Sequence, residues 1–521
     1  MAGDPLISSE YWTDIQITPQ DIEFLHTYLF EHEVPLTARE LVSVFINERA
    51  RIERLAVQMR RQAGGKTYVP RDSYQAGDDV IFPALDWKHG KVTAVRSGVN
   101  PEIGTFEVLT VDMDGGSARL FAANLSTHTL NNGSATVEDS EFNADTILQG
   151  YGNLLEKKIE SAFQADDELV RIAGRWFPRA LLVDVNVGHL NLAEAVLDMA
   201  AGEPLPTSAL LKDVALPEGV NPKLAEFSLN YALQDDERFD EVGPAGQVLW
   251  CLRRLEPAEV RDVPLYLEYA PIEHDRSALT PQMLDLEAHL DDELSEIHGP
   301  PSHEVKEVTI SLIFPHLRAG TLPLSARVRS LFPTAYESPR VRFTLVDGKT
   351  KQRMPGWVVR QHGYVYGLRD WYKANELMPG SLLRIRRGEN PGEVIIEAKT
   401  YRSTKDWVRT VIVGADGGLV FAMLKQSISA EFNDRMAFAI PSVEAVDQLW
   451  LQNKRPFEKL VADMIREMSK LTPQGHVHAQ ELYSAVNIVR RVPPAPLFAL
   501  LSTRPEFVHV GDLHFRLGEL E

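Results

Sequence analysis

The chain has 521 residues, of which 44% are hydrophobic and 25% charged, and its formal net charge is −20. A chain of this length is too long to fold around a single hydrophobic core, and it predicts about three to five domains of roughly 100–200 residues each. Because no apolar run reaches the ~18 residues of a membrane span and the opening MAGDPLISSEYWTD is too polar for a signal peptide, we expect a cytoplasmic protein.

Helical spacing of apolar residues predicts an N-terminal helical segment over residues 1–65. In EVPLTAREL, Thr37 is placed to cap a new helix, with Glu40 three residues further on. Short alternating runs such as DDVIFPA and GKVTAVRSG then predict a small SH3-like β-barrel of four to five strands over 66–132. The polar stretch NNGSATVEDSEFNAD leads into a helical linker, 133–188, with a helix over about 143–175.

An internal repeat is the clearest pattern in the chain. Two segments each contain a long helix, a break, a short helix, a longer helix and the pattern Phe-x-x-Val-Gly, which begins at Phe239 in one copy and at Phe507 in the other. Matching elements are 45 positions apart from Leu197 to Val242 and 46 apart from Met464 to Val510. Three helices closed by a β-hairpin predict winged helices over 189–256 and 455–521.

Charge is distributed unevenly between these copies. Residues 256–300 hold 12 Asp and Glu against 2 Arg, and we expect a solvated acidic helical linker over 257–304; shielding of the basic region and docking to a basic partner are the alternatives. From Pro323 to Arg409 there are 17 Lys and Arg against 8 Asp and Glu, a local charge of +9 that leaves −29 for the rest. This region predicts a basic β-rich domain, 305–415, followed by a β/helical connector, 416–454.

Strand alternation in the basic domain places arginines on outward positions, namely Arg340, Arg342, Arg384 and Arg386. The segment LRDWYKANEL predicts a short helix that buries Leu368, Trp371 and Leu377 and ends at Pro379-Gly380. Arginine suits nucleic-acid contacts because its planar fork of donors pairs with phosphates or with two acceptors of guanine. The alternative explanation is that these arginines lie on a solvated face of the barrel and point into water.

Shared features are a Leu-Pro-rich first strand followed by a short helix, a strand ending in Asp347-Gly348, a strand with Trp357, Gly363 before an aromatic strand, the Leu368-x-x-Trp371 helix and Pro379-Gly380. Their order and spacing resemble the pseudobarrel DNA-binding domain of the plant auxin-response-factor type, which is related to recognition domains of restriction enzymes. The likeness covers about 80 residues. It departs from the family at Ser381, where an acidic residue usually follows Pro-Gly. The resemblance implies two DNA-gripping loops, residues 315–323 with Arg318 and the turn Arg360-Gln361-His362-Gly363-Tyr364, with the first loop flanked by Ser325, Arg327 and Arg329.

The two repeat segments resemble HARE-type helix-turn-helix domains, found in restriction enzymes, chromatin proteins and the delta subunit of bacterial RNA polymerase. This resemblance implies contacts with DNA or with the transcription machinery. The first copy carries LQDDERFDE, whose acidity favours a protein contact over phosphate.

Signals for catalysis are weak. Glu397 and Lys399 form a Glu-x-Lys pattern after a strand, as in metal-dependent nucleases, with Asp347 or Asp370 as an extra carboxylate. The histidines His476, His478, His509 and His514 are better explained as surface or helix-start residues than as metal ligands. The one cysteine, Cys251, excludes a cysteine-based zinc cluster and is expected to be a buried structural thiol. We therefore expect no enzyme, metal or cofactor.

Together these patterns predict an α+β multidomain protein in which small β-barrels are combined with winged helix-turn-helix domains. We expect a DNA-binding protein, a transcriptional regulator or recognition component, that grips duplex DNA with the basic pseudobarrel. The alternative is a protein-interaction factor that contacts RNA polymerase or another protein through the winged helices and the acidic linker; a metal-dependent nuclease is the third.

Overall fold

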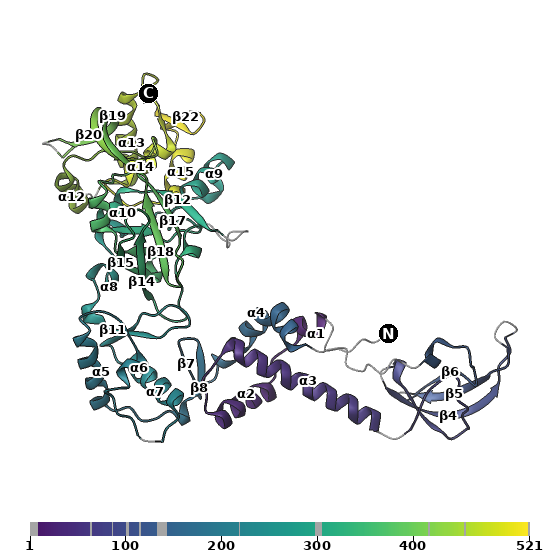
Figure 1. Cartoon of the computed structure of the whole chain (residues 1–521). Coiled ribbons are helices and arrows are strands. Elements are labelled where there is room, and N and C mark those ends of the chain that lie inside the picture. Colours follow the sequence, from purple (N-terminus) through teal and green to yellow (C-terminus); the bar gives the residue numbers. More distant parts are fainter. Residues whose placement is uncertain are drawn as a thin grey trace. The chain divides into compact units, whose positions relative to one another are not determined.

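The computed structural model describes residues 9–62, 65–85, 87–100, 104–113, 116–132, 143–217, 219–296, 305–414, 417–452 and 455–518. The chain forms two units, Met1–Val183 and Asp184–Glu521. The fold is mixed α+β, with helices and several separate sheets, the largest of which has seven strands and curls like half of a barrel (Figure 1). No helix among the described residues is long and apolar enough to cross a membrane.

The first unit begins with helices that pack around a three-stranded sheet with the order β1-β8-β7. These elements are α1 (Ser9–Asp14), α2 (Pro19–His32), β1 (Leu36–Thr37), α3 (Ala38–Gln62), α4 (Ala144–Phe163), β7 (Leu169–Ile172) and β8 (Arg175–Pro178). The predicted cap is confirmed, because the Glu40 N–H donates to Thr37 Oγ1 (3.2 Å) and Glu40 Oε2 accepts from the Thr37 N–H (2.7 Å).

A five-stranded sheet follows α3, in the region where the sequence predicts alternating strands. Its strands, in the order β2-β3-β4-β5-β6, are β2 (Lys66–Thr67), β3 (Asp79–Phe82), β4 (Lys88–Ser97), β5 (Glu107–Met113) and β6 (Ser117–Ala123). Buried Val80, Leu109 and Val111 fill its core. The polar stretch expected after it lies largely outside the described residues, which omit 133–142.

The helix expected over 143–175 is shorter than predicted, because it ends at Phe163. Residues 169–178 instead form the hairpin β7–β8. At its turn, Ala173 and Gly174 both have positive φ values, 47° and 75°, which suit the two-residue turn of a twisted hairpin. The apolar residues of LVRIAGRWF are therefore buried in two short strands rather than along one helical stripe.

Both segments of the predicted repeat have the same order of elements: helix, short strand, helix, helix and two strands. The first has α5 (Val187–Met199), β9 (Leu205–Pro206), α6 (Thr207–Leu210), α7 (Pro222–Asp235), β10 (Phe239–Glu241) and β11 (Leu249–Leu252). The second has α13 (Phe457–Met468), β21 (Val477–His478), α14 (Ala479–Val486), α15 (Pro494–Thr503), β22 (Phe507–Gly511) and β23 (His514–Leu517). In each, the short strand pairs with the last one.

The first unit contains a third copy of this arrangement, which the sequence patterns do not reveal. Helix α2, strand β1, helices α3 and α4 and the hairpin β7–β8 follow the same order, with the five-stranded sheet inserted between α3 and α4. Corresponding residues pair in all three sheets, as Leu36 with Trp176, Leu205 with Trp250, and Val477 with Phe515. We call these copies, in chain order, the first, second and third repeat.

The seven-stranded sheet lies between the second and third repeats in the sequence and has the order β12-β17-β18-β14-β15-β16-β13. Its elements are β12 (Glu307–Ser311), α10 (Phe314–Ala319), β13 (Thr321–Pro323), β14 (Arg340–Asp347), β15 (Arg353–Val359), β16 (Tyr364–Tyr366), α11 (Arg369–Ala374), β17 (Leu382–Arg387) and β18 (Glu393–Ala398). Alternate residues such as Leu345, Ile385 and Ile396 are fully buried inside it. The predicted helix is α11, and Leu368 and Trp371 are buried as expected.

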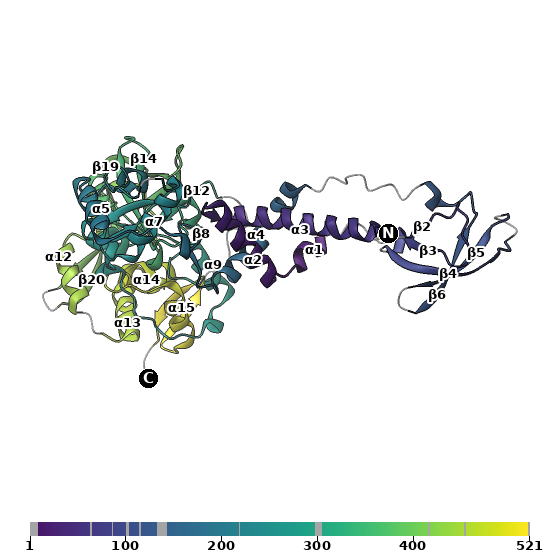
Figure 2. The ribbon, with the colours of Figure 1, turned by 90° about the horizontal axis from the view of Figure 1, so that it is seen from below.

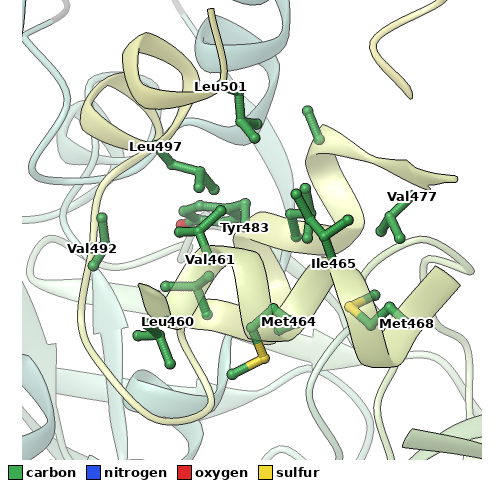
Figure 3. Packing of buried hydrophobic residues seen from close by; sticks show 14 of the residues in the cluster. Leu460, Val461, Met464, Ile465, Met468, Val477, Tyr483, Val492, Leu497 and Leu501 are labelled. Carbon is green, nitrogen blue, oxygen red and sulfur yellow. The ribbon is translucent and has the colours of Figure 1, made fainter. Parts of the chain in front are cut away.

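A long two-stranded ribbon follows the curled sheet (Figure 1). It consists of β19 (Thr400–Val413) and β20 (Leu419–Ala430), and α12 (Val443–Gln452) leads from it to the third repeat. Figure 2 shows α13, α14 and α15 grouped together. Figure 3 shows part of their shared core, which includes Leu460, Met464, Ile465, Tyr483 and Leu497.

The acidic segment is not the solvated linker that the sequence predicts. It contains α8 (Ala258–Arg261) and α9 (Pro281–Leu290), and the side chains of Glu287, Asp291, Asp292 and Glu293 are all buried. Burial of carboxylates requires partners. Glu287 pairs with Arg276 at 2.8 Å, and Asp291 accepts from Ser325 Oγ at 2.5 Å.

The third partner of this segment is Arg491, whose side chain is completely buried. Its Nη2 lies 2.5 Å from Asp292 and 2.7 Å from Glu293. Tyr483 donates to Asp292 at 2.5 Å, and His316 Nε2 lies 3.2 Å from Glu293. We call Arg491, Asp292, Glu293, Tyr483 and His316 the buried charge network. It joins the segment after α9 to α10 and to the third repeat.

Replacing Arg491 by Met is expected to destabilise the second unit by about 3–5 kcal/mol, because two buried carboxylates lose their shared cation. Differential scanning calorimetry of the full chain measures the change. Arg504→Met is the matched control, since its pair with Glu458 is about half exposed (54% and 38%) and such pairs contribute about 0–1 kcal/mol. Equal shifts in both variants would contradict a structural role for the network.

Candidate nucleic-acid interface

The first expected DNA-gripping loop, residues 315–323, is largely buried. It forms the end of α10 and strand β13, and Pro315, Thr321 and Leu322 have almost no exposure. Arg318 is turned to Asp447, with 2.7 Å between Nη2 and the carboxylate, and its guanidinium lies 5.6 Å from the centre of the Tyr266 ring. The loop does lie beside the second one, since the Leu324 N–H donates to Gly363 O.

Two more predicted contact residues are held by segments outside the sheet. Arg340 pairs with Asp240 and, at 3.3 Å, with Glu256, and only 12% of its side chain is exposed. Arg342 lies over Trp357 at 5.7 Å and within 3.6 Å of Glu203. Burial lowers the pKa of Arg342, as expected for a desolvated cation.

Tyr364 and Ser325 are also committed to internal hydrogen bonds. The Tyr364 hydroxyl donates to Glu259 O at 2.7 Å, and burial raises its pKa. Ser325 is 1% exposed and bonded to Asp291. Neither side chain is available to phosphate in this structure.

The remaining predicted residues lie at the surface, fully or in part. They are Arg327, Arg329, Arg360, Gln361, His362, Arg384 and Arg386. Arg384 lies 3.3 Å from Glu307, and Arg360 donates to Ser338 O at 2.7 Å. Arg387 Nη2 donates to Ser330 O at 2.6 Å, which places the turn carrying Arg327 and Arg329 beside the end of β17.

The ribbon β19–β20 carries an exposed basic and aromatic surface that the sequence patterns did not single out. Trp407 is 57% exposed and Tyr401 is 43% exposed. Side chains of this size are usually more fully buried. Trp407 is paired across the ribbon with Lys425, whose Nζ lies 5.4 Å from the ring centre. Lys405 is two residues from Trp407 and therefore lies on the same face.

Two further cations lie near this face. Arg402 is exposed near the start of β19, and Lys349 Nζ donates to Thr400 Oγ1 at 2.9 Å, which places the β14–β15 turn beside the ribbon. Among the described residues, Arg402 and Lys405 form no ion pair. The alternation of basic and aromatic residues in KTYRSTKDWVR is the signal that points to them in the sequence. We call Tyr401, Arg402, Lys405, Trp407 and Lys425 together the ribbon face. Lys405, Trp407 and Lys425 lie on one side of the ribbon, and Tyr401 and Arg402 lie near the start of β19, within a register shift between Thr400 and Thr404.

The nuclease candidates do not converge on one point. Asp347 on β14 pairs with buried Ile396 on the neighbouring strand β18, so both side chains lie on the same side of the sheet. Glu397 is the next residue of β18 and therefore faces the opposite side. Asp347 accepts from Trp371 Nε1 at 2.8 Å, and Lys399 pairs with Glu431 at 3.1 Å. In the part of the chain that the structure describes, no group of three His, Cys, Asp or Glu side chains is placed to hold a metal ion.

One histidine of the third repeat has a clear structural role. His478 caps α14 by accepting from the Gln480 N–H at 3.1 Å, and its Nε2 lies 3.0 Å from Arg435 Nη1. Burial, aided by Arg435 and His514, lowers the pKa of His478 to about 4. It is therefore a neutral imidazole that caps the helix.

In the second and third repeats, the third helix, which would be the DNA-reading helix of a helix-turn-helix, presents little positive charge. Helix α15 is buried along most of its length. Helix α7 buries Leu224, Phe227 and Leu229, and it exposes Lys223 at one end and acidic Asp235 at the other. The ribbon face is therefore the stronger candidate for contact with phosphate.

No protein-family model, no curated protein and no solved structure matches this chain.

The carboxyls around Arg340 make stability depend on pH. Burial, together with nearby Asp240, raises the pKa of Glu256 to about 8, while Arg340 opposes the shift. Glu256 therefore keeps its proton in the folded chain at pH values where the unfolded chain has lost it. This stability is fully present below the ordinary carboxyl pKa and is lost as the pH rises through about 8.

We expect the unfolding temperature of the second unit to fall between pH 6 and pH 9, and to fall less in Glu256→Gln. Glu241, whose pKa burial raises to about 7, contributes in the same direction, so the fall is reduced rather than abolished. The exposed substitution Glu237→Gln is the control. An identical pH profile for wild type and Glu256→Gln would refute the assignment.

Proposed function

We propose that this is a DNA-binding protein, a transcriptional regulator or recognition component, that contacts duplex DNA with its basic sheet domain. In this proposal the seven-stranded sheet is a pseudobarrel, the five-stranded sheet is a small barrel and the three repeats are winged helices. The observation that supports it best is the ribbon face, where cations and exposed aromatic rings are gathered in a chain of net charge −20.

The ribbon has a suitable shape for this task. A two-stranded β-ribbon fits the major groove of B-DNA, which is about 12 Å wide. Lys405 and Lys425 would contact phosphates, and Trp407 between them would lie against sugar or base edges. The arginines beside β17 (Arg327, Arg329 and Arg386) would add contacts to the backbone.

The paired arginines change how the basic domain contributes. Arg318, Arg340 and Arg342 pair with carboxylates outside the sheet, so in this proposal they hold the sheet to its neighbours and leave DNA contact to other cations. The remaining acidic surface repels phosphate, so it restricts binding to the places where cations are exposed.

A second candidate function is supported by helix α5 of the second repeat. Val187, Leu192 and Met199 are 67%, 47% and 87% exposed, and on the same helix Asp198 forms an exposed ion pair with Arg254 at 2.5 Å. Exposed apolar residues near a carboxylate suit a protein partner with a basic, apolar surface. Under this alternative the repeats contact the transcription machinery, as the acidity of LQDDERFDE also suggests.

Duplex binding by the full chain is expected to weaken steeply as salt rises, because bound phosphates release counterions. The double variant Lys405→Ala with Lys425→Ala removes two phosphate contacts and is expected to reduce the slope of log K against log salt by about two. Fluorescence anisotropy with labelled random duplex across a salt series measures both effects.

The matched control is Lys212→Ala with Lys223→Ala, which removes the same charge from exposed positions of the second repeat. Binding that weakens equally in both double variants would show a nonspecific charge effect and reject the ribbon face. An absence of binding at low salt would reject the DNA proposal as a whole and favour the protein partner.

A further inference from the structure

We infer that a groove at the start of the third repeat binds a mononucleotide, as a ligand site separate from the ribbon face. The groove has a volume of about 590 Å³ and is lined by residues 268–270, Trp450, residues 455–457 and residues 489–491. Small-molecule sites typically measure about 300–1,000 Å³. The groove is thus large enough for one nucleotide.

Aromatic rings form one part of the wall, namely Tyr269, Trp450 and Phe457. The indole of Trp450 is fixed because its Nε1 donates to Ile488 O at 2.7 Å. The Tyr269 hydroxyl accepts from the Ile272 N–H at 3.1 Å, which positions that ring as well. Rings held in place offer flat surfaces on which a base stacks, and such stacking contributes about 1–3 kcal/mol.

Arginines form another part of the wall, namely Arg455, Arg490 and Arg491. The guanidinium of Arg490 lies 5.8 Å from the centre of the Phe457 ring and donates a hydrogen bond to Arg455 O at 3.3 Å. A guanidinium has five N–H donors, so Arg490 keeps donors for a phosphate. Arg455 lies 3.6 Å from Asp463, an exposed pair that a phosphate can rearrange.

The start of α13 adds a favourable field for an anion. This helix begins at Phe457, and its N-cap residue Pro456 provides no side-chain hydrogen bond to the first N–H groups. Both residues line the groove. Uncapped N–H groups and the positive end of the helix dipole favour phosphate.

Arg491 also belongs to the lining of the groove, but its side chain is completely buried and paired with Asp292 and Glu293. The cations available to a ligand in this groove are therefore Arg455 and Arg490.

Glu268 distinguishes a nucleotide from a simple anion. It is the acidic side chain of the lining, and it would repel inorganic phosphate while accepting from ribose hydroxyls or a base amino group. Rings for a base, arginines for a phosphate and a carboxylate for the neutral polar part together match a nucleoside monophosphate. None of these residues belongs to the ribbon face.

Isothermal titration calorimetry of the full chain tests this with the four ribonucleoside 5′-monophosphates, adenosine and inorganic phosphate. We expect at least one nucleotide to bind with one-to-one stoichiometry, and adenosine and phosphate to bind at least about tenfold more weakly than it. Arg490→Ala is expected to weaken nucleotide binding at least about tenfold, while Arg516→Ala, an exposed arginine outside the groove, leaves it unchanged.

The melting temperature of Arg490→Ala guards against a folding artefact, because loss of this partly exposed side chain is expected to leave it close to that of the wild type. Lack of binding by every nucleotide would overturn the inference, as would binding that Arg490→Ala leaves intact. If Arg490→Ala instead weakens duplex DNA and no free nucleotide binds, the groove holds a backbone phosphate, and the mononucleotide site is rejected.

Discussion

The burial of one guanidinium, that of Arg491, constrains the second unit more than any other contact. A cation without solvent must be surrounded by acceptors, and here two carboxylates from the segment after α9 supply them. Because Glu293 also meets His316 at the start of α10, the same charges set the distance between the sheet and the third repeat. Burial alone would raise the pKa of Glu293, but Arg491 and His316 hold it below its usual range.

The same arrangement appears on a second side of the sheet, where Arg340 lies between Asp240 and Glu256. Carboxylates outside the sheet therefore pair with Arg318, Arg340 and Arg342 of the basic domain. The local charge of +9 is thus partly balanced within the unit. The ribbon face and the arginines at the end of β17 are among the cations that stay exposed.

Local patterns in the sequence predict local structure well. The cap at Thr37, the helix around Trp371 and the alternation of the sheet strands follow from neighbouring residues, and each is present. Partners of charged residues do not follow in this way. Arg340 and Arg384 occupy equivalent outward positions in their strands, yet the first is buried by distant carboxylates and the second is 51% exposed.

Long insertions hide other regularities, because the five-stranded sheet interrupts the first repeat and removes the equal spacing that reveals the other two. The ribbon face could not be predicted from the resemblance, because the resemblance implies contacts by loops of the sheet and does not extend to the strand that follows it.

The insertion within the first repeat also affects the order in which the chain is assembled. In the second and third repeats, the short strand meets its partner 45 and 38 residues later, so each closes soon after it leaves the ribosome. In the first repeat, β8 is synthesised 140 residues after its partner β1. During synthesis, α2 and α3 therefore emerge with their apolar faces uncovered while the inserted sheet is made. Of the three repeats, the first therefore keeps apolar surface exposed for the longest stretch of synthesis, and such surface is prone to aggregation.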